Sequence, residues 1–331
     1  MSLKLALVGA GRMGWVHARA LTGLSGCELA WVVDPEAHQA ERLAQAVGAR
    51  RGPLEAVLED PQVAGVVVAT PTATHAALAL EVIQAGKALF IEKPLAADLA
   101  SGAEVVRAAE RAGIPVQVGF QRRYDPAYLW AWHWIQEGKL GRILHFRGVA
   151  RDAPGPSPAY APTSGGVMVD MGIHDLDVAR FLVGEVSEVI GWPALQARKE
   201  FGVPDGGVAL LRFVGGAVGT LEVSWFSPEG YEIRAEVVGE RGRLVLERER
   251  QLEVDLYTSA GGSFLRPRDF EERFQEAYRA ELEAFVRALA LTHAPSPGPR
   301  EAWKSLRLAW AAQRALEEGR AVRVEEMGEE P

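Results

Sequence analysis

The first 119 residues alternate short apolar segments with segments of helical periodicity, and this alternation limits the possible folds more than any other feature. Strands are expected at Leu3–Gly9, Glu28–Asp34, Val63–Thr70, Ala88–Glu92 and Val116–Gly119, with helices near residues 13–23, 36–47, 73–85 and 97–113. Apolar strands that alternate with helices are typical of a parallel sheet covered on both faces. Residues 1–119 are therefore predicted to form a doubly wound α/β domain of the Rossmann type.

The pattern changes after Phe120. A helix is expected at Pro126–Glu137, a strand at Ile143–Arg151, another helix within residues 167–182, several strands within 186–258, and two closing helices at Glu271–Leu291 and Arg300–Glu318. Consecutive strands without intervening helices favour an antiparallel sheet. Residues 120–331 are therefore predicted to form a second domain, of the α+β class, with a mostly antiparallel sheet.

Composition excludes several classes of protein. The net charge is -8 and the chain has no run of basic residues, so a nucleic-acid partner is not expected. The apolar runs are too short for a membrane span, and the first strand begins at Leu3, so neither a membrane partner nor a signal peptide is expected. Cys27 is the single cysteine, which indicates a reducing compartment; we expect a cytoplasmic protein. Arginine greatly outnumbers lysine and asparagine is absent, which favours a thermophilic source or a GC-rich coding bias.

A glycine-rich motif follows the first strand. Gly9, Gly11 and Gly14 form the pattern G-x-G-x-x-G, with Arg12 and Met13 between the last two glycines. Such glycines allow a tight turn, close approach of the backbone to a pyrophosphate, and close packing of helix and strand. Asp34 stands twenty residues after Gly14, at the end of the second strand, where an acidic residue binds the ribose. The combination predicts a dinucleotide site.

The acidic residue also bears on which dinucleotide binds. Asp34 would accept hydrogen bonds from a ribose diol and repel a 2′-phosphate, and Pro35, Glu36 and Ala37 offer no cation. NAD is therefore expected rather than NADP, with Arg12 as the one cation that could favour the phosphate.

Two further motifs end strands of the same domain. Glu92-Lys93-Pro94 stands at the end of the expected strand Ala88–Glu92. Thr70 and Pro71, followed by His75, stand at the end of the preceding strand, Val63–Thr70. The carboxyl ends of strands line the ligand crevice of a doubly wound sheet, so Lys93 should face the nicotinamide. Thr70, Pro71, His75 and Glu92 are expected beside the cofactor.

Three ionisable residues share one stripe of the predicted helix at 167–182. Asp170, His174 and Asp177 stand at i, i+4 and i+7 within an otherwise apolar segment. Such groups are costly to bury unless they pair or do chemistry. A histidine base supported by a carboxylate is the simplest functional interpretation. A buried pair that only joins the two domains is the structural alternative.

The motifs together resemble the Gfo/Idh/MocA oxidoreductase family over almost the whole chain. The resemblance is carried by the glycine motif, by T-P-T-A-T-H at 70–75, by E-K-P at 92–94, by Q-V-G-F-Q-R-R-Y-D-P at 117–126 and by D-M-G-I-H-D-L-D at 170–177. Within the family, the segments 151–160 and 164–184 are most similar to bacterial inositol 2-dehydrogenases. The resemblance implies a large open-faced C-terminal sheet through which homotetramers form.

The resemblance also implies the activity and the residues for it. Lys93, Asp170 and His174 would be catalytic in the NAD-dependent oxidation of a secondary ring hydroxyl of a cyclic polyol or sugar, with myo-inositol expected first. Substrate contacts are expected from Gln121, Arg122, Asp177 and Tyr231, although either Arg122 or Arg123 could turn inward. The position of Tyr231 also suits an ordinary strand aromatic.

Other functions remain open at this point. Scyllo-inositol, an aldose or a dihydrodiol could replace myo-inositol, and a catalytically silent NAD-binding sugar sensor would use the same fold. A sensor has no need of a proton acceptor such as His174. Asp170 and His174 could ligate zinc, but neither Cys nor a further His lies near them in sequence, so no metal is expected in the reaction.

Overall fold

The computed structural model describes residues 2–153, 155–194, 198–247, 255–258 and 261–331. The chain divides into two compact units. The first comprises Met1–Tyr124, Glu276–Leu306 and Glu330–Pro331, and the second comprises Asp125–Gln275 and Arg307–Glu329. A single boundary near residue 119 was predicted, whereas the structure returns a late segment of the chain to the first unit.

The first unit contains a parallel sheet of six strands in the order β3-β2-β1-β4-β5-β6. Its strands are β1 (Leu3–Val8), β2 (Cys27–Val33), β3 (Arg50–Arg51), β4 (Val63–Val68), β5 (Ala88–Glu92) and β6 (Val116–Gly119). This order is that of a dinucleotide-binding Rossmann fold, and the direction of winding reverses between β1 and β4. The predicted doubly wound parallel sheet is confirmed.

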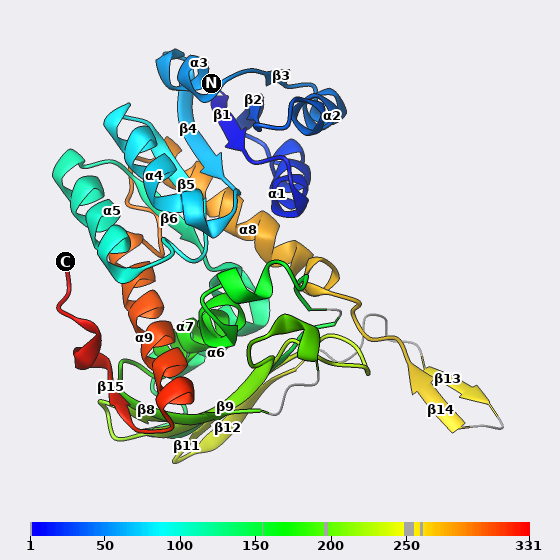
Figure 1. Ribbon diagram of the computed structural model, residues 1–331, viewed down its shortest axis with the longest axis vertical. Coiled ribbons are helices and arrows are strands. Elements are labelled where there is room, and N and C mark those ends of the chain that lie inside the picture. Colours follow the sequence, from blue (N-terminus) through cyan, green and yellow to red (C-terminus); the bar gives the residue numbers. More distant parts are fainter. Residues whose placement is uncertain (1, 154, 195–197, 248–254, 259–260) are drawn as a thin grey trace. The chain divides into compact units, whose positions relative to one another are not determined.

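Helices cover both faces of this sheet. They are α1 (Arg12–Thr22), α2 (Ala37–Val47), α3 (Leu54–Glu59), α4 (His75–Gln84) and α5 (Leu99–Ala112). Figure 1 shows α1 and α2 on one side of the sheet and α4 and α5 on the other. Gly48 and Gly113, which follow α2 and α5, have φ values of 74° and 63°, a left-handed backbone that glycine adopts without strain.

The late segment joins the core of the first unit through α8 (Phe270–Ala290). Leu282 and Phe285 of α8 are fully buried in the same apolar cluster as Leu5, Leu7 and Phe90 of the sheet. Because burial of each large apolar side chain contributes about 1.5–3 kcal/mol, this contact holds the segment to the sheet. Its partners on the sheet lie at least 190 residues away in sequence, which no local pattern reveals.

The second unit contains a mixed sheet of seven strands in the order β12-β11-β7-β10-β9-β8-β15. The strands are β7 (Ile143–Arg151), β8 (Val186–Pro193), β9 (Gly206–Phe213), β10 (Val218–Ser224), β11 (Glu232–Gly239), β12 (Gly242–Glu247) and β15 (Val322–Arg323). Only β7 and β10 pair in parallel, so the mostly antiparallel sheet is confirmed. A hairpin of β13 (Asp255–Thr258) and β14 (Gly261–Phe264) stands apart from this sheet. Residues 195–197 and 248–254 of the predicted strand region lie outside the described residues.

Helices α6 (Pro126–Gln136) and α7 (Ile173–Leu182) lie over one face of this sheet (Figure 1). Trp132 of α6 stacks on Phe181 of α7, with ring centroids 5.6 Å apart. The end of α9 (Pro299–Glu318) also packs on the sheet, because Gly191 and Gly207 leave room for Leu316 where any Cβ would collide with it. Among the described residues, no helix is both long and apolar enough to cross a membrane.

Candidate active site

The glycine-rich loop after β1 has the geometry that a pyrophosphate requires. Gly9 has φ 102°, and a Cβ there would lie 2.4 Å from the Ala69 carbonyl oxygen. A Cβ on Gly14 would lie 2.0 Å from the Gly9 carbonyl oxygen, so only glycine lets α1 begin against the strand end. A Cβ on Gly11 would meet nothing within 4 Å. The loop is therefore closed toward the sheet and open at Gly11, where the backbone and the start of α1 can receive phosphates.

Asp34, directly after β2, is tied to this loop. Its Oδ2 accepts a hydrogen bond from the Ala10 backbone N–H at 2.7 Å, and its Oδ1 accepts one from the Glu36 N–H at 2.8 Å. A carboxylate has about four acceptor positions, so it can still accept from the two hydroxyls of a ribose. Asp34 therefore links the expected ribose site to the expected pyrophosphate site.

His75 connects the loops that follow β4 and β5. The imidazole is buried, with Nδ1 2.7 Å from the Pro94 carbonyl oxygen and Nε2 2.9 Å from the Thr70 carbonyl oxygen. Burial lowers the pKa of His75, which favours the neutral ring despite both carbonyl contacts. His75 therefore fixes the loops beside the expected nicotinamide position, while Pro71 stays at the surface.

Lys93 follows the last residue of β5, as predicted, and its side chain is half-buried. The preceding residue, Glu92, accepts a hydrogen bond from the Lys93 backbone N–H through Oε2 at 3.1 Å. The other oxygen, Oε1, lies 2.7 Å from Nε2 of buried His17 in α1. The backbone that carries Lys93 is thus anchored to the inside of the unit.

The motif around Asp170 begins with a π-helix, Met168–Gly172, which continues into α7. A π-turn is rare and often occurs at a functional site. Asp170 accepts hydrogen bonds from the Tyr160 hydroxyl at 2.9 Å and from the Trp225 indole N–H at 3.1 Å. Neither donor was predicted, because Tyr160 lies in the irregular segment before the helix and Trp225 lies 55 residues after Asp170.

The other predicted members of this motif have different exposures. His174 in the first turn of α7 is half-buried, as is Asp170, whereas Asp177 is 1% exposed. Tyr231, directly before β11, is also buried. All four residues belong to the second unit.

Gln121 and Arg122 lie in a short 3₁₀-helix, Gln121–Tyr124, after β6 and are both buried. The Gln121 amide donates to the Tyr278 hydroxyl at 3.2 Å. Arg122 is 3% exposed and Arg123 is half-buried. Asp125, which follows this 3₁₀-helix, accepts a hydrogen bond from Arg273 at 2.9 Å.

The Rossmann topology, the open glycine loop and Asp34 together define an NAD-binding protein of the Rossmann class. Residues 3–120 match the oxidoreductase family with an NAD-binding Rossmann fold, and residues 128–245 match the GFO/IDH/MocA C-terminal domain. The chain belongs to the Gfo/Idh/MocA family, as its motifs predicted.

Its relatives cover essentially the whole chain. It is 34% identical to a scyllo-inositol 2-dehydrogenase (NAD(+)) of Bacillus subtilis over 98% of this chain and 96% of that protein. It is 31% identical to a myo-inositol 2-dehydrogenase of Thermotoga maritima over 98% and 99% of the two chains. The crystal structure of a putative myo-inositol dehydrogenase from Sinorhizobium meliloti superposes with a TM-score of 0.94 at 32% identity, covering 98% of this chain and 100% of that one.

Replacing Asp34 with serine is expected to weaken NADH binding about 10–100-fold, because hydrogen bonds to a charged acceptor contribute about 1.5–3 kcal/mol. NADPH binding should improve relative to NADH, since the charge that repels a 2′-phosphate is gone. Fluorescence titration with both nucleotides measures the ratio. Asp60→Ser is the matched control, because Asp60 also accepts backbone and side-chain hydrogen bonds but follows α3. An unchanged ratio in Asp34→Ser would show that Asp34 is not the ribose ligand.

Proposed function

We propose that the protein oxidises a secondary ring hydroxyl of a cyclic polyol, with myo-inositol, giving the 2-keto-inositol, as the first substrate. The observation that carries this proposal is the residue set itself: Lys93 at the carboxyl end of β5 and Asp170 with His174 around a π-turn. The names of the relatives, which are inositol dehydrogenases, support a cyclic polyol.

Each catalytic residue has a distinct role in this reaction. NAD, when bound, supplies the hydride acceptor. The Lys93 ammonium donates a hydrogen bond to the reacting oxygen and stabilises the negative charge that develops there. His174 accepts the hydroxyl proton, a role that suits an imidazole near neutral pH. Asp170 stabilises the resulting imidazolium, as a carboxylate does in other histidine-based sites.

The remaining predicted residues would recognise the polyol. Asp177 offers carboxylate oxygens that suit vicinal hydroxyls, and it lies one helical turn beyond His174. Gln121 and Arg122 offer amide and guanidinium donors, and Tyr231 offers a hydroxyl. A ring that carries a hydroxyl on every carbon has enough donors and acceptors for all of them.

Scyllo-inositol is the second candidate substrate. A relative with 34% identity over almost the full chain is a scyllo-inositol 2-dehydrogenase. The two isomers differ in the orientation of one hydroxyl, so the same residues can serve either.

A panel assay tests the proposal. The purified protein is mixed with NAD and one compound at a time from a set of inositol isomers, aldoses and a dihydrodiol, and the near-ultraviolet absorbance of NADH is followed. The highest kcat/KM is expected for myo-inositol. A higher value for scyllo-inositol would select the second candidate. NAD binding without turnover of any compound would indicate a sensor.

Replacing Tyr160 with phenylalanine is expected to lower kcat about tenfold, with KM almost unchanged. The change removes one hydrogen bond to the Asp170 carboxylate, and such a bond contributes about 1.5–3 kcal/mol. Steady-state kinetics separates the two constants. Tyr124→Phe is the control, because the Tyr124 hydroxyl donates to the Ser296 carbonyl oxygen instead. A rise in KM with unchanged kcat would contradict a positioning role through Asp170.

The open face of the second unit's sheet is proposed to form a homotetramer. The register places Leu210, Thr220, Arg147, Glu236 and Val245 in one row across five strands. Leu210 and Val245 are 45% and 48% exposed, so the row offers apolar surface at both of its ends, with polar groups between them.

Leu210→Glu is expected to dissociate this assembly, because it places a charge in an apolar contact. Light scattering coupled to size-exclusion chromatography gives the mass. Val214→Glu is the control, since Val214 is 72% exposed and follows the end of β9. A monomeric wild-type protein would contradict the proposal.

A further inference from the structure

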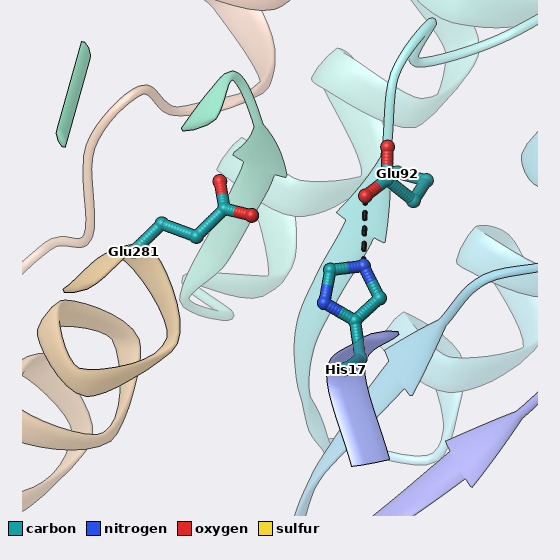
Figure 2. A group of neighbouring side chains, drawn as sticks. All are labelled: His17, Glu92 and Glu281. Atoms are coloured by element: carbon teal, nitrogen blue, oxygen red, sulfur yellow. Dashed lines mark hydrogen bonds and ion pairs between the residues drawn. The ribbon is translucent and has the colours of Figure 1, made fainter. Parts of the chain in front are cut away.

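Three ionisable side chains meet inside the first unit. They are His17 of α1, Glu92 of β5 and Glu281 of α8, and their exposed fractions are 0%, 7% and 0%. Figure 2 shows them pointing toward one another from three elements. One nitrogen of His17 and one oxygen of each carboxylate lie within 4.8 Å of each other.

Glu281 is the member of this group that the surrounding protein leaves uncompensated. Neither of its carboxylate oxygens has a hydrogen-bond partner within the described residues, and the same holds for Nδ1 of His17. Burial of the carboxyl and the proximity of Glu92 raise the pKa of Glu281 well above its ordinary value. A carboxyl group without a partner is costly to bury, so its retention in a packed core calls for a physical reason.

The neighbourhood of Glu281 has more acceptors than donors. Gln117 donates its amide N–H to the Glu281 backbone carbonyl at 3.0 Å, and Gln121 donates to Tyr278 one turn earlier on α8. The side-chain carbonyl oxygens of both glutamines lack a hydrogen-bond partner in the described part of the chain. The aromatic rings of Phe90 and Tyr278 pack against His17 in T-shaped contacts, and these rings carry no positive charge that could compensate the carboxylates. An excess of buried acceptors is what a cation compensates.

We propose that His17, Glu92 and Glu281 form a binding site for a divalent transition-metal ion, with Zn²⁺ as the expected occupant. One imidazole nitrogen and two carboxylate oxygens are ligands that zinc accepts, and two carboxylates balance its charge. Ligand distances of about 2.0–2.2 Å place tetrahedral ligand atoms about 3.4 Å apart. The hydrogen-bonded contact of 2.7 Å between His17 and Glu92 would therefore open, and separations of up to 4.8 Å would close by about 1.4 Å, with water as the fourth ligand.

The ion would have a structural role and take no part in hydride transfer. It would link α8, which returns from late in the chain, to α1 and to the residue that precedes Lys93. Metal binding to a folded site adds its free energy to folding, because the three ligands are not assembled in the unfolded chain.

The test uses the full, tag-free protein and does not depend on the proposed activity. After dialysis against a chelator and then addition of Zn²⁺, gel-filtered protein is expected to retain about one zinc ion per chain by mass spectrometry. The thermal unfolding midpoint should rise by about 5 °C with saturating Zn²⁺. Co²⁺ in place of Zn²⁺ should give the visible absorption of a tetrahedral complex in the wild-type protein, a readout that needs no variant.

Glu281→Gln should bind Zn²⁺ at least about 100-fold more weakly and lose the rise in the midpoint, whereas the matched Glu283→Gln should behave as wild type. Glu283 lies on the same helix but is exposed and paired with Arg287. Zinc retention by Glu281→Gln equal to that of the wild type would place the ion elsewhere and overturn the proposal. If the wild-type protein retains no zinc, shows no shift of the thermal unfolding midpoint and gives no cobalt spectrum, the proposal is wrong. The three groups then share a proton and bind no metal ion.

Discussion

Replacing Lys93 with methionine is expected to lower kcat for polyol oxidation by about 10²–10³-fold while leaving the Kd for NAD within about twofold. Methionine keeps most of the length of the side chain but cannot donate a hydrogen bond or carry charge. The ammonium acts mainly where negative charge develops on the reacting oxygen, so its loss affects the transition state more than cofactor binding. Steady-state kinetics with myo-inositol and a separate NADH fluorescence titration measure the two quantities.

The matched control for Lys93→Met is Lys139→Met. Lys139 is an exposed lysine whose ammonium forms an ion pair with Glu137 and lies over the ring of Trp134, so its removal should leave kcat unchanged. A kcat near the wild-type value in Lys93→Met would exclude Lys93 from the proposed mechanism. A loss of NAD affinity comparable to the loss of kcat would instead make Lys93 a cofactor ligand.

Much of the fold of the first unit could be predicted because its signals are local. The apolar runs at β1, β4 and β5 each predict a strand without knowledge of the rest of the chain. The two-residue β3 and the six-residue α3 were not predicted, since elements of that length carry too little periodicity. The placement of α8 from Glu276 onward with the first unit depends on burial of Leu282 and Phe285 against distant strands, which a local pattern cannot encode.

The candidate site divides in the same way. The glycine loop, Asp34 and Lys93 could be predicted, because each depends on spacing or on a position at the end of a strand. The donors Tyr160 and Trp225 could not, since the loop that carries Tyr160 and the residue that follows β10 reach Asp170 only through tertiary packing. The expected stripe of Asp170, His174 and Asp177 assumed a regular α-helix, whereas Asp170 lies in a π-turn.

The cluster of His17, Glu92 and Glu281 had one weak signal in the sequence. His17 interrupts the buried face of α1, and Glu281 stands beside Leu282 in the buried stripe of α8. A polar residue within an apolar stripe indicates a buried partner but does not identify it. The three residues come from the beginning, the first third and the last part of the chain, so only the folded structure brings them together.

Replacing His174 with alanine is expected to lower kcat by about 10²–10⁴-fold, with KM for the polyol and Kd for NAD changed much less. The hydroxyl proton then has no acceptor, and an alkoxide is costly to form in a site with little water. Added imidazole should restore part of the rate in His174→Ala and leave the wild-type rate unchanged, because a small base can enter the space that the side chain vacates. That rescue distinguishes a proton acceptor from a residue that only holds the helix in place.

The control for the loss of a histidine is His38→Ala. The side chain of His38 is 78% exposed on α2, so its removal should affect neither kcat nor the response to imidazole. If His174→Ala turns over at the wild-type rate, the proton leaves by another route and Asp170 has no imidazolium to stabilise. Rescue by imidazole in His174→Ala together with its absence in Lys93→Met would assign the proton to His174 and the stabilisation of the oxygen to Lys93.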